Sequence, residues 1–412
     1  MITKILTTTS RYLLAFVFIF SGFVKGIDPF GFTYKLTDYF IAFNLDFLKP
    51  FALYLSVAAC AAELLIGLLL LFGVKIRTAA WGAFLFMAFF TPLTFVIAIF
   101  NPVSDCGCFG DAIKLSNWGT FFKNIPLFLA AWLLLTQRKH FAKAINPIFE
   151  TVIAVMLVIV SILPSANGYR HLPMIDFLPY SVGTNIPQAM SIPAGAPSDE
   201  YITTLFYEKD GVVKEFNEQN FPWQDSTWKF VDTKSVLVKE GFKPPITDFT
   251  LENNEGLIVT DSILNYPGYF LLLVSQNLEK VDIEVTKDFN PLCFKANKQG
   301  FGFACVTASP IESIDKFIGN TGAAYPFFTA DETMLKSVVR ANPGLLLLYN
   351  GTIIGKWHFR DIPDIEYFEG NLLAKQTEQF RHKLQNQRAL CFSLCIVLLL
   401  MAFSLVKRGR RT

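Results

Sequence analysis

The stretch FALYLSVAACAAELLIGLLLLFG, residues 51–73, is almost entirely apolar and carries one charged residue, Glu63. A helix needs about 20 apolar residues to cross the ~30 Å hydrocarbon layer of a bilayer. A helix is the default structure in this layer, because it satisfies its backbone hydrogen bonds without water. The stretch therefore predicts a membrane-spanning helix that contains one carboxylate.

Further apolar runs of similar length follow the same pattern. We expect spans at about residues 9–27, 79–100, 119–136, 148–164 and 389–406. The chain of 412 residues is 52% hydrophobic and contains 43 Phe, which is too apolar for an ordinary soluble protein. Membrane lipid is therefore the expected surrounding, and the formal net charge of +2 argues against a nucleic-acid partner.

Basic residues predict the orientation, because short cytoplasmic loops carry an excess of Lys and Arg. Lys75 and Arg77 separate the second and third spans, Arg138 and Lys139 separate the fourth and fifth, and KRGRR (407–411) follows the sixth. All three clusters fall on one side if six helices alternate across the membrane. We therefore expect both termini to be cytoplasmic.

This topology places three regions outside the cytoplasm. They are the loops 28–50 and 101–118 and the polar segment 165–388. Disulfides persist in such a compartment, so cysteines in these regions are candidates for redox chemistry.

Two cysteines lie one residue apart in SDCGCFGD, residues 104–111. Two extended residues place their Cα atoms at most ~7 Å apart, and a disulfide needs about 4.4–6.8 Å. Gly107 permits the bend that closes such a ring, and Gly110 is a second candidate structural glycine. A small, strained disulfide is labile, so Cys106 and Cys108 are the candidate catalytic redox pair.

Two other interpretations of this loop stay open. In one the loop is structural and its thiols are inert. In the other it is part of a metal site, which needs about two further ligands; the four His residues show no metal-ligand spacing, and we expect no metal. Asp105 and Asp111 disfavour a thiolate and Lys114 favours one, so the sign of the net effect on the thiol pKa stays open.

Charged residues within membrane spans are candidates for function. Glu63 lies near the middle of its span, and Cys60 is one helical turn away on the same face. Lys25, near the outer end of the first span, is placed to reach toward Glu63, and Asp28 follows at the interface. These four residues form either a polar, proton-handling site or a buried pair that fixes helix register.

The segment FSGFVKGIDPFGFTYKLTDYF (20–40), the span around Glu63 and the loop DCGCFGD resemble the DoxX-like membrane family, and most closely its MauE-like branch. The resemblance covers roughly residues 5–140. It implies a four-helix membrane domain over residues 1–140 in a bacterial inner membrane, associated with thiol redox work, disulfide handling or quinone-linked oxidation. Cys106 and Cys108 match the motif cysteines, and a quinone cofactor is implied by this resemblance alone.

The rest of the chain divides into five parts. We expect a fifth membrane helix within 141–164, a linker and small strand-rich module at 165–241, an α/β domain at 242–364, a polar connector at 365–388, and a C-terminal anchor with a basic cytoplasmic tail at 389–412. On the predicted topology, the three middle parts are extracytoplasmic, which in a bacterial envelope means periplasmic.

Residues 242–364 show strand, helix, strand, helix and hairpin patterns in that order, which indicates a mixed α/β fold. This order resembles the thioredoxin-like fold, and Pro343 falls where that fold has its cis-proline. The Cys-x-x-Cys motif of that fold should follow YFLLLVS (269–275), but the chain reads SQNLEKVD (275–282). The resemblance therefore implies a domain that binds or positions a protein without thiol chemistry of its own.

The remaining cysteines have structural explanations. Cys305 lies in a buried-strand pattern and is expected in the core, and a disulfide with Cys293 is the alternative. Cys391 and Cys395 fall in the last span and are expected to face lipid or pack against other helices.

These features predict an accessory of extracytoplasmic thiol–disulfide or quinone-linked redox processes, such as protein maturation, that works with an extracytoplasmic protein partner. The alternative is a non-enzymatic, membrane-anchored scaffold whose thioredoxin-like domain binds an envelope protein. A transporter is a third and weaker interpretation, because no inverted repeat is apparent.

Overall fold

The computed structural model describes residues 2–103, 105–141, 146–217, 219–239 and 241–379. The predicted last span at 389–406, with Cys391 and Cys395, lies outside the described residues. The chain forms two compact units. One is Thr184–Phe249, and the segments before and after it make up the other.

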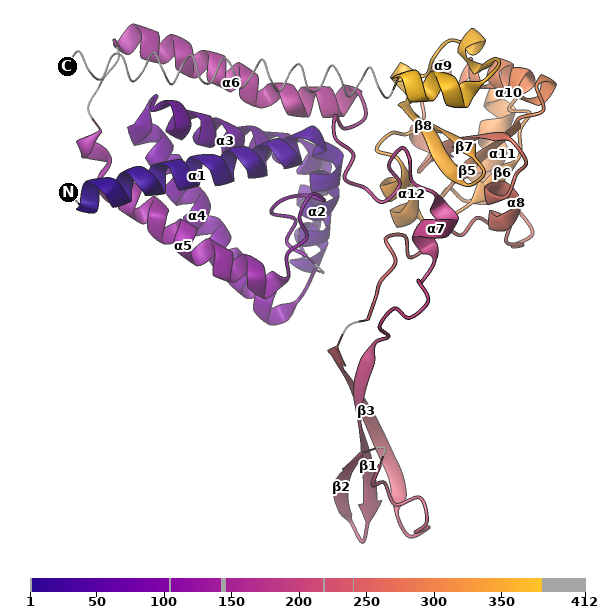
Figure 1. Ribbon diagram of the computed structural model, residues 1–412, viewed down its shortest axis with the longest axis horizontal. Helices are drawn as coiled ribbons and strands as arrows, with labels where there is room; N and C mark the ends of the chain where they lie inside the picture. The colour runs from indigo at the N-terminus through magenta and orange to yellow at the C-terminus, as the bar shows by residue number, and fades with distance from the viewer. Residues whose placement is uncertain (1, 104, 142–145, 218, 240, 380–412) are drawn as a thin grey trace. The chain divides into compact units, whose positions relative to one another are not determined.

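Five helices of the larger unit are long and apolar enough to cross a membrane. They are α1 (Ile2–Ile27), α3 (Ala52–Phe72) with the preceding 3₁₀ turn η1 (Asp46–Phe51), α4 (Ile76–Phe100), α5 (Asn117–Thr136) and α6 (Pro147–Arg170). They pack as a bundle in which α1 lies against α3, α4 against α5, and α6 against α3 (Figure 1). The five N-terminal spans predicted from hydropathy are confirmed, although α1 begins earlier and α6 ends later than expected.

Two glycines allow α1 and α3 to pack closely. A Cβ atom on Gly22 would lie 2.5 Å from the backbone nitrogen of Leu64, and one on Gly67 would lie 2.7 Å from that of Ile19. Small residues bring helix backbones together in membranes, where the hydrophobic effect gives little drive for association. The α1–α3 pair therefore depends on having no side chain at these two positions.

The segment 28–50, which we expected to be a loop, contains a helix. α2 (Pro29–Ala42) begins after Asp28, whose carboxylate accepts a hydrogen bond from the Gly31 N–H at 2.9 Å. Asp at the N-cap followed by Pro at the first helical position is a strong helix start. The expectation was wrong because hydropathy marks only helices long enough to span a bilayer, and α2 has 14 residues.

A second region of the larger unit is built on a five-stranded sheet of order β6-β5-β4-β7-β8. The strands are β4 (Tyr269–Ser275), β5 (Gly302–Thr307), β6 (Phe327–Thr329), β7 (Gly344–Tyr349) and β8 (Thr352–His358). The first three are parallel to one another, and β7 runs antiparallel to both β4 and β8. A parallel pair joined by a helix and followed by an antiparallel hairpin is the thioredoxin-like arrangement, as predicted.

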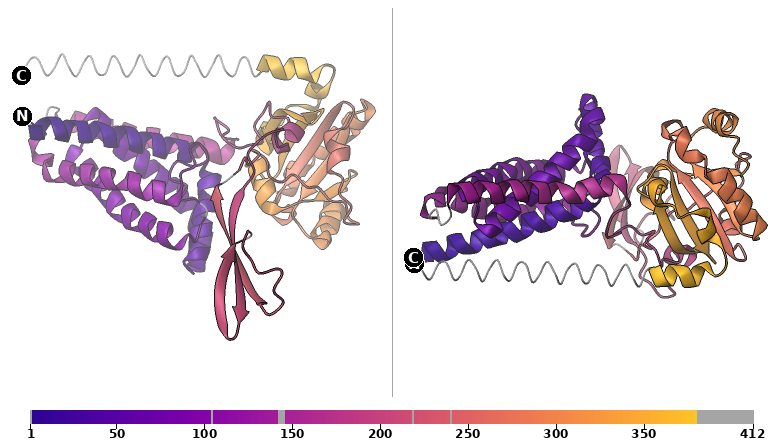
Figure 2. Two further views of the ribbon diagram at one scale, coloured as in Figure 1. Left: turned by 60° about the horizontal axis from the view of Figure 1, so that its bottom comes forward. Right: turned by 90° about the horizontal axis from the view of Figure 1, so that it is seen from above.

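Helices pack around this sheet (Figure 2). They are α8 (Thr260–Leu264), α9 (Ile283–Thr286), α10 (Phe289–Lys298), α11 (Ile311–Thr321) and α12 (Glu332–Val338), with the 3₁₀ turns η3 (Leu278–Lys280), η4 (Phe359–Asp361) and η5 (Ile365–Phe368). Leu271 and Leu347 are fully buried in a core that includes Cys293 and Cys305. Both cysteines are free thiols, so no disulfide joins them.

The smaller unit contains a short helix, α7 (Ile186–Met190), and a three-stranded antiparallel sheet of order β2-β1-β3. Its strands are β1 (Glu200–Lys209), β2 (Val212–Asn217) and β3 (Lys229–Lys239). Asp210 and Gly211 join β1 to β2 with φ of +53° and +77°. Two positive φ values are typical of the tight hairpin turn whose twist matches that of the strands.

Candidate functional site

The loop between α4 and α5, residues 101–116, carries the two neighbouring cysteines and is called the thiol loop. Gly107 and Gly110 have φ of +61° and +54°, a region that glycine adopts readily. The Gly110 N–H donates to the Gly107 carbonyl at 3.0 Å, and the Gly107 N–H donates to Asp105 Oδ1 at 2.9 Å. Both glycines therefore bend the loop around its cysteines.

Cys106 and Cys108 contact each other as free thiols. The Cys108 N–H donates to Cys106 Sγ at 3.3 Å, and the same sulfur lies 3.5 Å from the Thr120 hydroxyl on α5. Cys106 is only 7% exposed, whereas Cys108 is half-buried. Cys106 Sγ thus has hydrogen-bond partners in the loop and on α5, and Cys108 is the more accessible thiol.

The pKa values of these thiols shift in opposite directions. The hydrogen bond with the Cys108 thiol lowers the pKa of Cys106; the Thr120 hydroxyl, the Cys108 N–H and the charge of Lys123 act in the same direction, and burial opposes them. The same thiol–thiol hydrogen bond, together with burial, raises the pKa of Cys108. The cation that favours the thiolate is Lys123 on α5, where the sequence pointed to Lys114. A thiolate is the reactive form of cysteine, so the lowered pKa makes Cys106 the candidate for the activated thiol.

The helix that the sequence did not reveal holds the thiol loop from one side. Lys35 on α2 forms an ion pair with Asp105 at 2.8 Å, and the Tyr39 hydroxyl donates to the Cys106 carbonyl at 2.7 Å. The Asp28–Pro29 helix start was the signal that could have located this helix, but nothing in the sequence pattern pairs its side chains with the loop.

Lys25 and Glu63 form an ion pair between α1 and α3, with Nζ and Oε1 2.7 Å apart. Ser21 Oγ lies 2.8 Å from the second Glu63 carboxylate oxygen and 2.8 Å from the Cys108 carbonyl oxygen. A hydroxyl donates one hydrogen bond, so Ser21 serves one of these acceptors at a time. The predicted Lys25–Glu63 pair therefore lies next to the thiol loop, with the Ser21 hydroxyl between them.

The other two residues of the predicted polar cluster take no part in this ion pair. Asp28 caps α2 and forms an ion pair with Arg340 of the thioredoxin-like region at 2.9 Å. Cys60 is 1% exposed, within α3 where it faces α1 near Gly26. The four residues thus serve one intramembrane ion pair, one helix cap and one packing position.

A cavity of about 230 Å³ lies within the bundle beside the thiol loop. Cys106, Cys108, Lys25 and Glu63 contribute to its wall, which is otherwise mainly aromatic and aliphatic. The apolar side chains include Phe18, Phe32, Phe86, Phe90, Met87 and Leu127. Within the described parts of the chain, no group of three or more His, Cys, Asp or Glu residues is placed to hold a metal ion.

Comparison with known families gives two matches to parts of the chain. Residues 3–137 match the family of the methylamine utilisation protein MauE, a match that spans α1 to α5 and the thiol loop. Residues 201–240, in the smaller unit, match a domain of unknown function, DUF8463. No curated protein matches the chain. The fold and the site thus define a multi-pass membrane protein with a MauE-like helical domain and a thioredoxin-like region.

Solved structures of thioredoxin-like proteins show limited similarity to the chain. A peroxiredoxin Q of Xanthomonas campestris is 16% identical, over 32% of this chain and 90% of its own, with a TM-score of 0.23. A putative protein disulfide isomerase from Bacteroides thetaiotaomicron is 17% identical, over 34% of this chain and 86% of its own, also with a TM-score of 0.23. The strand order described above, and not this similarity, identifies the fold.

Proposed function

We propose that this protein carries out thiol–disulfide exchange on the extracytoplasmic side of a bacterial inner membrane, as an accessory in the maturation of exported proteins. The contact between Cys106 and Cys108 carries the proposal, because the pKa of one thiol is lowered while that of its neighbour is raised. Oxidation of the pair forms one S–S bond and releases two electrons and two protons. The ring is small, and a strained disulfide is a good oxidant of other thiols.

The unequal pKa values favour one direction of attack on the oxidised pair. A client thiolate attacks the Sγ atom of Cys108, the more accessible cysteine, and Cys106 leaves because the thiol with the lower pKa leaves faster. A second client thiolate then attacks the client sulfur of the mixed disulfide and releases Cys108. The client gains one disulfide, and the loop returns to two thiols that take up the two protons of the client.

A quinone is the electron acceptor that suits the cavity. The cavity volume of about 230 Å³ is below the ~300–1,000 Å³ of pockets for drug-sized ligands, so the cavity suits a single quinone ring. Aromatic and aliphatic side chains would hold the ring and exclude water, and Lys25 would bind a carbonyl oxygen at the polar end. Such a group, when bound, supplies a sink for the two electrons and two protons that the thiols lose.

The redox state of the pair in cells tests the proposal. Cells are quenched in acid, and free thiols are alkylated with a maleimide of known mass. The mass of the peptide that contains Cys106 and Cys108 is then measured by mass spectrometry. We expect a disulfide that forms reversibly. In Cys106→Ser, the Cys108 thiolate can attack a disulfide of an oxidised client, the reverse of the step above, and it should stay joined to the client because no Cys106 thiolate is present to release it. Cys108→Ser should trap far less.

Cys60→Ser is the matched control, because Cys60 is a buried cysteine of the bundle outside the thiol loop. This variant should leave the redox state of the pair unchanged. If both thiols stay reduced in cells and neither variant traps a protein, the proposal is wrong.

A membrane-anchored scaffold is the second candidate function. Gln276 and Asn277 follow β4 where the thioredoxin-like fold would place its cysteines, while Cys293 and Cys305 are buried in the core. In a scaffold this region would bind an envelope protein, and a variant lacking both Cys106 and Cys108 would keep full function. Loss of function in that double variant, with normal membrane insertion, excludes the scaffold.

A further inference from the structure

We propose that Arg340 of the thioredoxin-like region is a positioning residue for the thiol loop, and that this region occupies its own client-facing end by binding the membrane domain of the same chain. The contact does not depend on the proposed function, but its effect on thiol exchange rests on it.

The residues involved lie at one end of the five-stranded sheet. β4 ends at Ser275 and β7 begins at Gly344, and these antiparallel neighbours pair Val274 with Gly344. The segments that follow β4 and precede β7 therefore meet, and Asn342 joins them: its Oδ1 accepts from Ser275 Oγ at 2.8 Å, and its Nδ2 donates to the Asn277 carbonyl at 2.8 Å. The Asn342–Pro343 peptide bond is cis.

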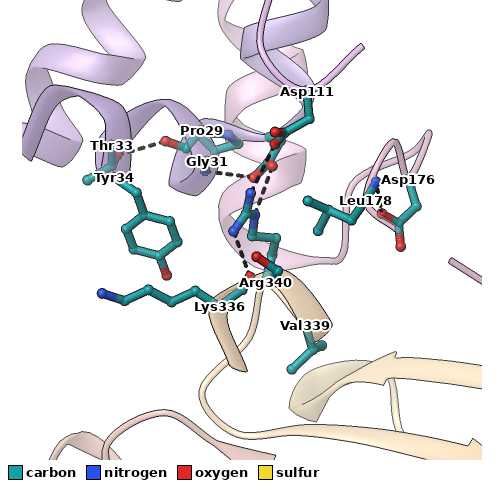
Figure 3. Close-up of polar contacts among 12 residues, drawn as sticks. Pro29, Gly31, Thr33, Tyr34, Asp111, Asp176, Leu178, Lys336, Val339 and Arg340 are labelled. Carbon is teal, nitrogen blue, oxygen red and sulfur yellow. Dashed lines mark hydrogen bonds and ion pairs between the residues drawn. The ribbon is translucent and has the colours of Figure 1, made fainter. Parts of the chain in front are cut away.

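Arg340, at this end of the sheet, forms ion pairs with two carboxylates of the membrane domain. Figure 3 shows Arg340 beside one of them, Asp111. Its Nε lies 2.9 Å from Asp28 Oδ2, and its Nη2 lies 3.1 Å from Asp111 Oδ2. The third nitrogen, Nη1, donates to the Lys336 carbonyl at 2.6 Å. The Arg340 side chain is 7% exposed, so its charge is shielded from water and depends on these partners.

Tyr34 on α2 forms a second contact with the same end of the sheet. Its hydroxyl donates to Gln276 Oε1 at 3.2 Å, and burial raises the pKa of Tyr34 to about 12, which keeps the phenol protonated. The Arg340 guanidinium lies 5.2 Å from the centre of the Tyr34 ring, within cation–π range. Gln276 stands where a thioredoxin-like protein would carry its redox motif, so this position is used for docking.

Gly31 leaves room for the contact between Asp28 and Arg340. A Cβ atom at this position would lie 2.4 Å from Asp28 Oδ2 and 3.0 Å from Arg340 Nη2. Any larger residue would therefore push the carboxylate and the guanidinium apart. The helix start at Asp28–Pro29 thus serves both to begin α2 and to receive Arg340.

The consequence for the thiols follows from Asp111, which lies in the thiol loop three residues after Cys108. Arg340 holds the loop at Asp111, while Lys35 holds it at Asp105 on the other side of the cysteines. The loop is therefore clamped at both ends of the C-G-C-F-G motif. Release of Arg340 would free the end that carries Cys108, the thiol that a client reaches first.

Hydrogen exchange and alkylation of the full chain in lipid nanodiscs test this assignment. In Arg340→Ala we expect amide exchange over residues 105–112 and alkylation of reduced Cys108 to be faster by about tenfold or more, the factor that corresponds to about 1.4 kcal/mol. Arg340→Lys keeps the charge but loses the fork that reaches both carboxylates, so it should give a smaller increase. Asp111→Asn removes one arm alone and should also increase both rates.

Arg11→Ala is the matched control, because Arg11 also donates two hydrogen bonds between segments, to the carbonyls of Leu70 and Leu71. It should leave exchange in residues 105–112 unchanged. Unchanged exchange and alkylation in Arg340→Lys and Asp111→Asn, both tested as folded proteins, would overturn the assignment even if Arg340→Ala fails to fold. Because exchange needs no turnover, the assignment can hold even where the cysteine variants disprove thiol exchange.

Discussion

Lys25 on α1 and Glu63 on α3 form an ion pair of 2.7 Å whose side chains are 3% and 9% exposed. The pair is largely buried, and Ser21 Oγ lies within hydrogen-bond distance of both its carboxylate and the Cys108 carbonyl. The buried Lys25–Glu63 pair is therefore separated from the thiol loop by one side chain, that of Ser21. Four predictions follow from this pair, from the loop and from the helix packing.

Lys25→Met should destabilise the protein strongly, because it leaves the Glu63 carboxylate buried without a partner. Breaking a buried ion pair typically costs about 3–5 kcal/mol, whereas replacing both partners with apolar residues is often neutral. The double variant Lys25→Met/Glu63→Met should therefore be more stable than Lys25→Met. Unfolding of the full chain in detergent, followed by circular dichroism, measures both.

Lys49→Met is the control for this prediction. Lys49 pairs with Asp46 at 2.8 Å, but the two side chains are 40% and 68% exposed. Exposed pairs contribute about 0–1 kcal/mol, so this variant should unfold close to the native protein. A double variant less stable than Lys25→Met would show that the pair contributes more than charge compensation.

Cys106 should react with alkylating agents at a lower pH than an ordinary thiol. Its pKa is lowered, chiefly by the hydrogen bond with the Cys108 thiol, so the thiolate persists as the pH falls below the ordinary value of about 8.5. The midpoint of the rate against pH should therefore lie below that value. Thr120→Val removes a donor to the sulfur and should move the midpoint upward.

Thr136→Val is the comparison variant, because Thr136 lies on the same helix and bonds only to the Leu133 carbonyl within it. It should leave the midpoint of the Cys106 reaction in place. A midpoint at or above about 8.5 in the native protein would contradict the assignment of Cys106 as the activated thiol.

Tyr39→Phe should loosen the thiol loop without unfolding the bundle. The variant loses the 2.7 Å hydrogen bond to the Cys106 carbonyl and keeps the ring. One hydrogen bond contributes about 0.5–1.5 kcal/mol net, so amide exchange near Cys106 should rise about two- to tenfold. Tyr54→Phe, at a position 73% exposed on α3, should not change it; equal effects in the two variants would argue against a loop-specific role.

Gly22→Ala should separate α1 from α3. The added methyl group would lie 2.5 Å from the Leu64 backbone nitrogen, and backbone has little freedom to move aside. Overpacking typically costs about 1–3 kcal/mol. Gly319→Ala, on α11, meets nothing within 4 Å and should be neutral or stabilising, since alanine favours helices. The midpoint temperature of thermal unfolding should therefore fall in Gly22→Ala and stay the same or rise in Gly319→Ala.

Local patterns predicted the parts of the structure that depend on neighbouring residues. The apolar run around Glu63 predicted α3, and the strand and helix rhythm after residue 242 predicted the thioredoxin-like order. The positions of Lys25 and Glu63 in two neighbouring predicted spans were sufficient to suggest their contact. In these cases the periodic pattern of apolar residues along the sequence indicates the type of secondary structure.

Long-range pairing was beyond the sequence pattern. Arg340 lies 229 residues from Asp111 and 312 from Asp28, and no periodicity connects such positions. Tyr39 and Lys35 were missed because α2 is short and was expected to be a loop. Asp28 was predicted as a site residue, but its partner is Arg340 and not the Lys25–Glu63 pair.

The long separation of Arg340 from Asp111 also orders events in time. A ribosome adds about 5–20 residues per second, so the two acids are made on the order of 10–60 seconds before the arginine that binds them. A nascent chain therefore carries both cysteines before the loop can be clamped. The thiols therefore acquire their final environment only after Arg340 has been made, long after the loop that carries them has been synthesised.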